Sequence, residues 1–320
     1  MNNTLLGIHH VTAIAGDPQQ NVDFYAGILG LRMVKKTINF DDPYTYHLYY
    51  GDEVGLPGTL ITFFPWSSHA HRGTKGTGQL TVFSFSVPRD AMGFWMDRLQ
   101  RNHISFGDPI VRFGEEVLTA MDHDGFQFEL IASQHDTRSS WENGDVPGKY
   151  AIRGFHSVTL SETNDAGTPD FLRASLGFRR SGEEENRSRF EVGGGGSGTI
   201  VDILLRPDVM PGYMGVGIVH HVAWRAPDDE TQLVIREKLI TNGVGVTPVI
   251  DRNYFHSIYF NEPGGVIFEV ATDPPGFMVD ESNDALGTSL KLPKQYESQR
   301  EKIENTLPKI HLPNKALSKL

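Results

Sequence analysis

The sequence contains no cysteine among its 320 residues. Disulfide bridges, thiolate metal sites and cysteine nucleophiles are therefore excluded. The sequence also lacks an apolar run close to the roughly 18 residues that a membrane-spanning helix needs. Its first ten residues, MNNTLLGIHH, lack the basic start and the apolar core of a secretory signal. From these absences we expect a cytoplasmic protein that has no membrane partner.

The sequence also has fewer basic than acidic residues. Lysine and arginine number 29 against 40 aspartates and glutamates, and the formal net charge is −11. An acidic chain is a poor partner for a phosphate backbone, whose binding depends on lysine and arginine. Residues 291–319 are rich in basic side chains, but acidic residues interrupt them, and we interpret the stretch as a solvated helix. We therefore expect no nucleic-acid partner.

One structural unit recurs four times along the chain, and such a repeat constrains the fold. Residues 8–16 predict a strand, Asp17 followed by Pro18 predicts the start of a helix, and three strand-like runs follow. Similar β-α-β-β-β units begin at residues 79, 154 and 218. The pattern predicts an α+β protein built from four βαβββ modules.

A long polar stretch separates the second unit from the third. We expect residues 1–133 to hold an N-terminal pair of modules, 134–151 to form a linker and 152–280 to hold a C-terminal pair. A length of 320 residues suits two domains of this size. Residues 281–320 contain the amphipathic run KQYESQREKIENTL and predict a helical tail that packs across the domains.

The tripeptide His-His-Val occurs twice, at residues 9–11 and 220–222. Neighbouring residues of a strand point to opposite faces, so one imidazole of each pair can face a shared metal. Glu269 lies in the strand-like run GGVIFEVATD, where an unpaired buried carboxylate would be costly. Two imidazoles and one carboxylate with open positions form the facial triad of non-haem Fe(II) oxygenases. The alternative for each residue alone is a hydrogen-bonded place in the core.

The four units, over residues 8–277, resemble the vicinal oxygen chelate superfamily, in which modules pair into curved mixed sheets that enclose a metal. In that superfamily the ligand is the histidine immediately before the valine of the first strand. A third ligand comes from the last strand of a module. The resemblance thus implies the metal ligands His10, His221 and Glu269, in a cavity shared by the first and fourth units.

The second and third units differ at these positions. Glu129 matches Glu269 in its module, but the second unit has no histidine in its first strand. In the third unit His156 takes the place of His9, and Ser157 takes the place of the ligand. We therefore expect one metal per chain.

Three longer stretches, residues 21–52, 58–66 and 251–277, carry a closer resemblance. They are similar to the ring-cleaving dioxygenases that act on hydroquinones, a group found in chlorophenol degradation and in bacterial quinone resistance. The resemblance implies one Fe(II) per chain, a small aromatic substrate, and O₂, both of whose atoms enter the opened ring. It leaves open which diphenol is used, and it is compatible with a homodimer and with either a catabolic or a detoxifying role.

The resemblance also implies roles for residues around the metal, because relatives use the matching positions to hold and deprotonate the substrate. The implied catalytic residues are His9, His220, Arg252 and Tyr259. The acid/base group is then His220 or His9, since a histidine titrates near neutrality. Thr12 and His256 are expected to contact the substrate, and His256 stands where many relatives carry arginine.

Two other functions remain open. Glyoxalase-type isomerases and transferases share the scaffold and usually complete the metal with a fourth protein ligand, but the run TLITFFPW offers no carboxylate, imidazole or thiol. A non-catalytic protein that binds aromatic compounds would need the cavity without the triad. Two side chains also keep alternatives: Tyr259 could fill the core, and His47 is expected in the core or beside the metal ligands.

Overall fold

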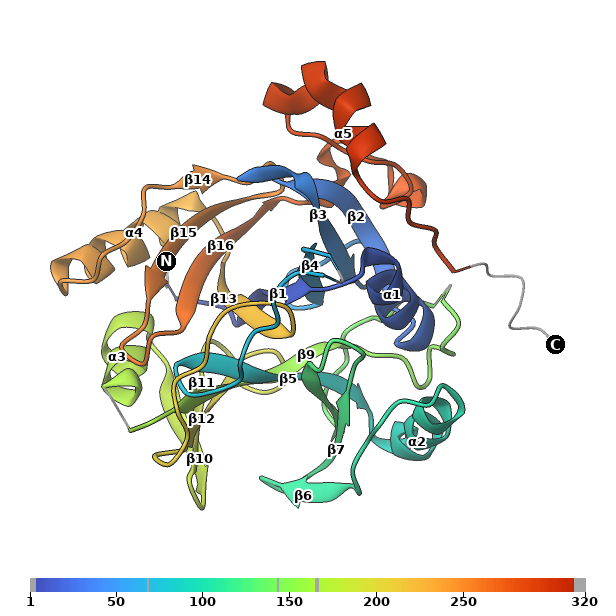
Figure 1. Cartoon of the computed structure of the whole chain (residues 1–320). Helices are drawn as coiled ribbons and strands as arrows, with labels where there is room; N and C mark the ends of the chain where they lie inside the picture. Colours follow the sequence, from blue (N-terminus) through green and yellow to red (C-terminus); the bar gives the residue numbers. More distant parts are fainter. Residues whose placement is uncertain (1–3, 68, 143, 165–166, 314–320) are drawn as a thin grey trace.

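The computed structural model describes residues 4–67, 69–142, 144–164 and 167–313. Its strands form two eight-stranded mixed sheets, each curved into a half barrel (Figure 1). The first sheet contains, in spatial order, β14 (Ile250–Asp251), β15 (Phe255–Asn261), β16 (Ile267–Pro275), β13 (Ile218–Ala226), β1 (Ile8–Ala15), β4 (Leu60–Pro65), β3 (Asp42–Gly51) and β2 (Arg32–Asn39). The second contains β10 (Arg179–Glu184), β11 (Arg187–Glu191), β12 (Ile200–Leu205), β9 (Gly154–Glu162), β5 (Gln79–Pro88), β8 (Gln127–Ser133), β7 (Glu115–Met121) and β6 (Ile110–Arg112).

Each sheet joins two βαβββ modules, the first and fourth in one sheet and the second and third in the other. The modules meet through antiparallel pairs at the sheet centres, β1 with β13 and β5 with β9. In Figure 1 the two sheets lie back to back, with β1 and β13 facing β5 and β9. The predicted fold class is confirmed, and each sheet contains one module from residues 1–133 and one from 152–280.

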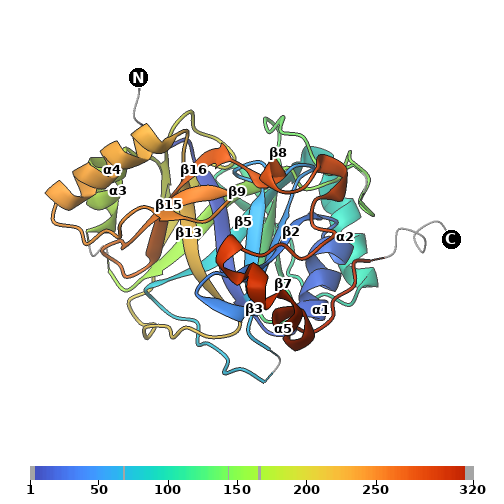
Figure 2. The ribbon, with the colours of Figure 1, turned by 90° about the horizontal axis from the view of Figure 1, so that it is seen from above.

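The helices pack in pairs on two sides of the sheets. They are α1 (Pro18–Val22), which continues as a π-helix (Asp23–Ile28), α2 (Met92–Arg101), α3 (Thr168–Leu176) and α4 (Asp229–Thr241). Figure 2 shows α1 beside α2 on one side and α3 beside α4 on the other. As predicted, Asp17 caps α1, since its carboxylate accepts from two backbone amides, with Pro18 at the first helical position. None of the helices in the described ranges has the length and apolar character to cross a membrane.

The segment after β16 folds back along the free edge of the first sheet. It contains short 3₁₀ segments and α5 (Arg300–Thr306). Lys291 donates its backbone N–H to the oxygen of Lys36 on β2, 2.9 Å away. The buried Lys35 ammonium lies 2.5 Å from the carboxylates of both Asp280 and Glu281. This segment therefore covers an edge strand whose polar groups would otherwise be exposed.

Strand alternation separates core residues from site residues in the middle of the first sheet. Val11 and Val222 are fully buried in the apolar core that both sheets share. Because successive side chains alternate, the preceding His10 and His221 point to the other, concave face. The His-His-Val motif thus anchors the strand with its valine and presents its second histidine to the cavity.

Candidate metal centre and substrate cavity

Three side chains from neighbouring strands of the first sheet meet at one point. His10 lies on β1, His221 on β13 and Glu269 on β16, and all three are buried. His10 Nε2 is 3.3 Å from both His221 Nε2 and Glu269 Oε2, and His221 Nε2 is 2.9 Å from Glu269 Oε2. These are the three residues predicted as metal ligands, and they are the one group in the described ranges whose ligand atoms lie close enough together to hold a metal ion.

The three atoms suit a shared metal ion. Two ligands at right angles around a metal, with bonds of about 2.1 Å, are separated by about 3 Å. Glu269 Oε2 is buried, and no described residue hydrogen-bonds to it. Burial would raise the pKa of Glu269, but His10 and His221 hold it well below its ordinary value, so the carboxylate is ionised. An ionised oxygen that faces two imidazoles at metal-ligand spacing fits a divalent cation.

Each of the two candidate ligand histidines is contacted, on the ring nitrogen away from Glu269, by the histidine that precedes it. His10 Nδ1 lies 2.9 Å from His9 Nδ1, and His221 Nδ1 lies 2.8 Å from His220 Nδ1. An imidazole that presents Nε2 to a metal carries its proton on Nδ1, so His9 and His220 accept there and carry their own protons on Nε2. His9 Nε2 then donates to the backbone oxygen of Thr272, 3.2 Å away. The two outer histidines are placed to orient the inner pair.

A cavity of about 260 Å³ opens beside His10 and His221. Its apolar wall consists of Phe40, Phe64, Trp66 and Phe255. Its polar wall consists of His10, Asn39, Asp41, His47, Tyr49, His220, His221, Arg252 and Tyr259. A small cavity with several aromatic rings on one wall and polar groups on the other suits a flat aromatic molecule that carries polar substituents.

Residues 7–130 and 154–279 match the family described as the Glyoxalase/Bleomycin resistance protein/Dioxygenase superfamily. The chain belongs to this superfamily. Maize glyoxalase I shares its fold, with a TM-score of 0.63 and 14% identity over 83% of this chain and 92% of that one.

Within the superfamily, nearer relatives carry the names of dioxygenases. The chain is 47% identical to MhqO of Bacillus subtilis, named as a candidate ring-cleaving dioxygenase, over 96% of this chain and 97% of the relative. It is 35% identical to the chlorohydroquinone/hydroquinone 1,2-dioxygenase of Sphingobium indicum, over 94% and 95%. The crystal structure of a candidate dioxygenase from Bacillus subtilis matches with a TM-score of 0.93 and 46% identity, over 97% and 99%. These relatives confirm the predicted enzyme class, a ring-cleaving dioxygenase.

Three of the predicted outer residues of this superfamily member line the cavity, namely His220, Arg252 and Tyr259. Arg252 donates its Nε–H to the Tyr259 hydroxyl at 3.3 Å and lies 3.4 Å from the carboxylate of Asp41. Burial and the negative charge of Glu269 raise the pKa of Tyr259, so its phenol stays protonated. With Arg252 on its oxygen, the Tyr259 hydroxyl is left to donate to an acceptor in the cavity.

The other predicted outer residues do not line the cavity. His9 lies behind His10, as described above. The Thr12 hydroxyl is buried and lies 2.8 Å from the hydroxyl of Thr62. His256 lies at the protein surface, where its Nδ1 is 2.6 Å from the carboxylate of Asp229 on α4. Contact of Thr12 or His256 with a substrate would therefore need a change in these hydrogen bonds.

Several cavity residues were not singled out from the sequence. Tyr49 and residues 39–41, at the end of β2 and the turn after it, line the cavity, and so does His47, which was expected in the core or beside the ligands. Ser257 donates its hydroxyl to Glu269 Oε1 and so holds the carboxylate from the side away from the imidazoles. His47 and Tyr49 are two positions apart on β3 and share a face, which is the signal that could have linked them.

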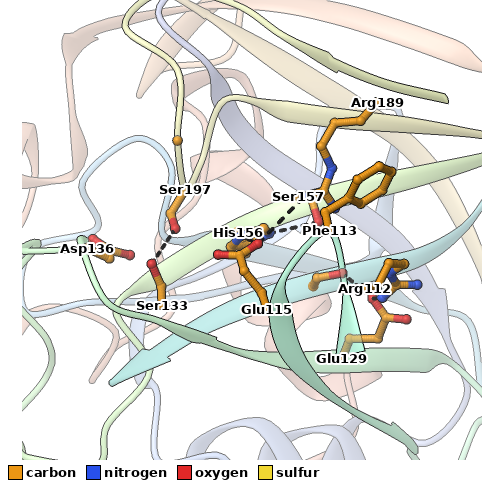
Figure 3. Close-up of polar contacts among 12 residues, drawn as sticks. Arg112, Phe113, Glu115, Glu129, Ser133, Asp136, His156, Ser157, Arg189 and Ser197 are labelled. Carbon is orange, nitrogen blue, oxygen red and sulfur yellow. Dashed lines mark hydrogen bonds and ion pairs between the residues drawn. The ribbon is translucent and has the colours of Figure 1, made fainter. Parts of the chain in front are cut away.

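The second half barrel holds an arginine cluster in the equivalent place. Arg112 lies 2.7 Å from Glu129 (Figure 3). Arg189 lies 2.8 Å and Arg187 3.1 Å from the buried carboxylate of Asp202. These acids therefore have guanidinium partners where the first sheet has imidazoles.

His156 is the histidine that the sequence placed in the third unit, and both of its ring nitrogens contact polar side chains. Its Nε2 lies 3.0 Å from the carboxylate of Glu115, and its Nδ1 lies 3.1 Å from the hydroxyl of Ser157 (Figure 3). The third unit thus brings one imidazole to this place, where the first sheet brings two, and one metal per chain stays a prediction.

Proposed function

We propose that the chain is an Fe(II)-dependent dioxygenase that opens the ring of hydroquinone-type diphenols. One iron per chain would be held by His10, His221 and Glu269. The observation that carries the proposal is the buried Glu269 Oε2, which lacks a hydrogen-bond partner among the described residues and lies 2.9 to 3.3 Å from two imidazoles. Iron bound there supplies electrons to O₂ and lowers the pKa of a hydroxyl group bound to it.

The substrate class rests on the cavity and on one relative. The aromatic rings of Phe40, Phe64, Trp66 and Phe255 surround a space suited to a single ring. The relative from Sphingobium indicum is named for chlorohydroquinone and hydroquinone, and this chain covers 95% of its length. Both observations support a diphenol that approaches the metal together with O₂.

The neighbouring strand supports dioxygenation over isomerisation. Thr62 on β4 is the structural counterpart of Glu269 on β16. Thr62 pairs with Thr12, two positions after His10. Glu269 pairs with Ala223, two positions after His221. The Thr62 hydroxyl is bonded to Thr12 and His47, at 2.8 and 2.9 Å. It does not complete the metal site, so positions for O₂ and a substrate hydroxyl remain. A fourth protein ligand would have favoured the isomerase or transferase alternative.

The residues around the candidate ligands have different proposed roles, which follow from where each one lies. Of the two candidate acid/base groups, His220 lines the cavity and His9 does not. Burial and His221 lower the pKa of His220 to about 3, so its ring is neutral at physiological pH. With its Nδ1 facing His221 and its proton on Nε2, this neutral ring can donate a hydrogen bond to a substrate oxygen. Tyr259, held by Arg252, is placed to donate to an oxygen that becomes negatively charged.

The test is O₂ uptake by protein loaded anaerobically with Fe(II) and mixed with 2-methylhydroquinone, with catechol as the comparison diphenol. Uptake with the hydroquinone that is lost in Glu269→Ala would support the proposal. No uptake with any diphenol, despite one bound metal per chain, would contradict it and favour an isomerase or transferase. Metal analysis of protein purified without added metal separates iron from other ions.

A further inference from the structure

The first sheet has an internal symmetry that relates the two walls of its cavity. β1 and β13 lie at its centre, so β4 and β3 on one wing correspond to β16 and β15 on the other. Tyr49 of β3 pairs with Thr62 of β4, as Tyr259 of β15 pairs with Glu269 of β16. Both tyrosines line the cavity. Tyr49 is therefore the structural counterpart of Tyr259, reached from the opposite wing.

Tyr49 ends a chain of hydrogen bonds. Thr12 is joined to Thr62 at 2.8 Å, Thr62 to His47 Nε2 at 2.9 Å, and His47 Nδ1 to the Tyr49 hydroxyl at 2.9 Å. Burial lowers the pKa of His47 well below its ordinary value, so the neutral ring donates through one nitrogen and accepts through the other. The described residues give the Tyr49 hydroxyl this one partner, which leaves its second hydrogen-bonding direction for a molecule in the cavity.

The two tyrosines differ in the charge of the groups that hold them. Arg252 donates to Tyr259, which leaves the Tyr259 hydroxyl as a donor and suits an ionised oxygen. The neutral His47 can either accept from Tyr49 or donate to it, so Tyr49 can itself donate or accept. A neutral substrate hydroxyl also does both. The Tyr49 wing therefore matches a hydroxyl that stays protonated, and the Tyr259 wing matches one that loses its proton beside the metal.

We propose that Tyr49 binds the hydroxyl group of the diphenol that is not bound to the metal, and that His47 is the residue that positions Tyr49. The inference rests on the proposed function, because it requires a diphenol in the cavity. It adds a specificity determinant on the wing where the sequence singled out no substrate-binding residue.

The test compares two ligands that differ by one hydroxyl. Dissociation constants of Fe(II)-loaded protein are measured without O₂ for hydroquinone and for 4-methylphenol, which carries a methyl group in place of one hydroxyl. Loss of one hydrogen bond changes an affinity by about tenfold. In Tyr49→Phe we expect the preference for hydroquinone to fall by about that factor. The matched control is Tyr50→Phe, which removes a buried hydroxyl bonded to Asn21 and should keep the preference.

The positioning role of His47 has its own readout. His47→Leu should lower the same preference, and Tyr49→Phe added to it should cause no further fall, because both changes act on one hydroxyl. His47→Gln, which keeps a donor and an acceptor, should restore part of the preference. A purely structural role would instead weaken both ligands equally.

Two outcomes separate this inference from the proposed function. Oxygen uptake with an unchanged preference in Tyr49→Phe would overturn the role of Tyr49 and leave the dioxygenase intact. Absence of binding and of uptake with every diphenol in the unaltered protein would overturn both.

Discussion

The two half barrels share one architecture but accommodate their buried acids differently. In the first, Glu269 faces two imidazoles and keeps one oxygen without a hydrogen-bond partner among the described residues. In the second, Asp202 occupies the equivalent place in the strand register, and Arg187 and Arg189 bind both of its oxygens. The acid of the first half barrel can thus bind a metal cation, whereas arginine side chains already provide the positive charge in the second.

The contrast has a simple electrostatic basis. A buried carboxylate needs positive charge close by, because desolvation is costly. An arginine supplies that charge permanently and directs its donors at the acid, so no position stays open. Imidazoles carry no permanent charge, so a metal bound between them would add lasting positive charge and keep positions for other ligands. A few side chains, rather than the fold, therefore separate a candidate catalytic centre from a structural core.

The largest effect is expected from Glu269→Gln, which keeps the shape of the side chain and removes its charge. Substitution of a residue that only supports a metal ligand lowers metal affinity or activity by about 10- to 100-fold. Substitution of a ligand itself should therefore lower them by more than about 100-fold. Iron content and O₂ uptake measure the effect. Retention of one iron per chain would show that Glu269 is not a ligand.

The matched change in the second half barrel is Asp202→Ala. It leaves Arg187 and Arg189 buried without their shared acid, which should lower the free energy of unfolding by about 3 to 5 kcal/mol. Urea unfolding measures this loss. Iron content per folded chain should not change, and a fall in it would show that the two half barrels are coupled more tightly than their separate sites suggest.

The junction between the half barrels should be sensitive to pH through Asp122, which accepts a hydrogen bond from Tyr25. Burial raises the pKa of Asp122 from 3.8 to about 6. Between these values the folded protein keeps a proton that the unfolded chain has lost, so this residue lowers stability as pH rises, by about 3 kcal/mol in total.

Asp122→Asn removes this titration, so its stability relative to the unaltered protein should increase as pH rises from about 4 to about 6. Unfolding by urea across this range measures the difference. Parallel curves for the two proteins would show that Asp122 does not titrate there.

The smallest effect is expected from removal of the metal. A ligand that binds only the folded state stabilises it by about 2.7 kcal/mol at a free concentration 100 times its Kd. Chelation should remove this increment from the unaltered protein and from Asp202→Ala, but Glu269→Gln should have no increment to lose. Thermal unfolding with and without anaerobic Fe(II) checks all three.

The repeated module and the three candidate ligands could be predicted because each is marked by a pattern that spans only a few consecutive residues. His-His-Val marks the central strand of a sheet, and Glu269 lies in an apolar run where a carboxylate needs a partner. The choice of His10 over His9, and of His221 over His220, came from resemblance to known proteins. Strand alternation alone left either member of each pair open.

The rest of the cavity depends on contacts between distant segments. His47 and Tyr49 reach the site because β3 pairs with β4, and the local sequence does not specify that pairing. Thr12 lies close to His10 in the chain, but Thr62 holds its hydroxyl. His256 lies near Tyr259, but α4 brings Asp229 to its ring.

Local patterns along the chain indicated the four modules and the chemical types of the candidate metal ligands, because alternation and capping act over a few residues. Long-range packing established which side chains surround each buried acid. Burying both sheets against a common core sets the register of strands from different modules, and that register places Ser257 and two imidazoles around Glu269 but arginines around Asp202. The difference between the candidate metal site and the arginine-paired acid is therefore a property of the assembled sheets.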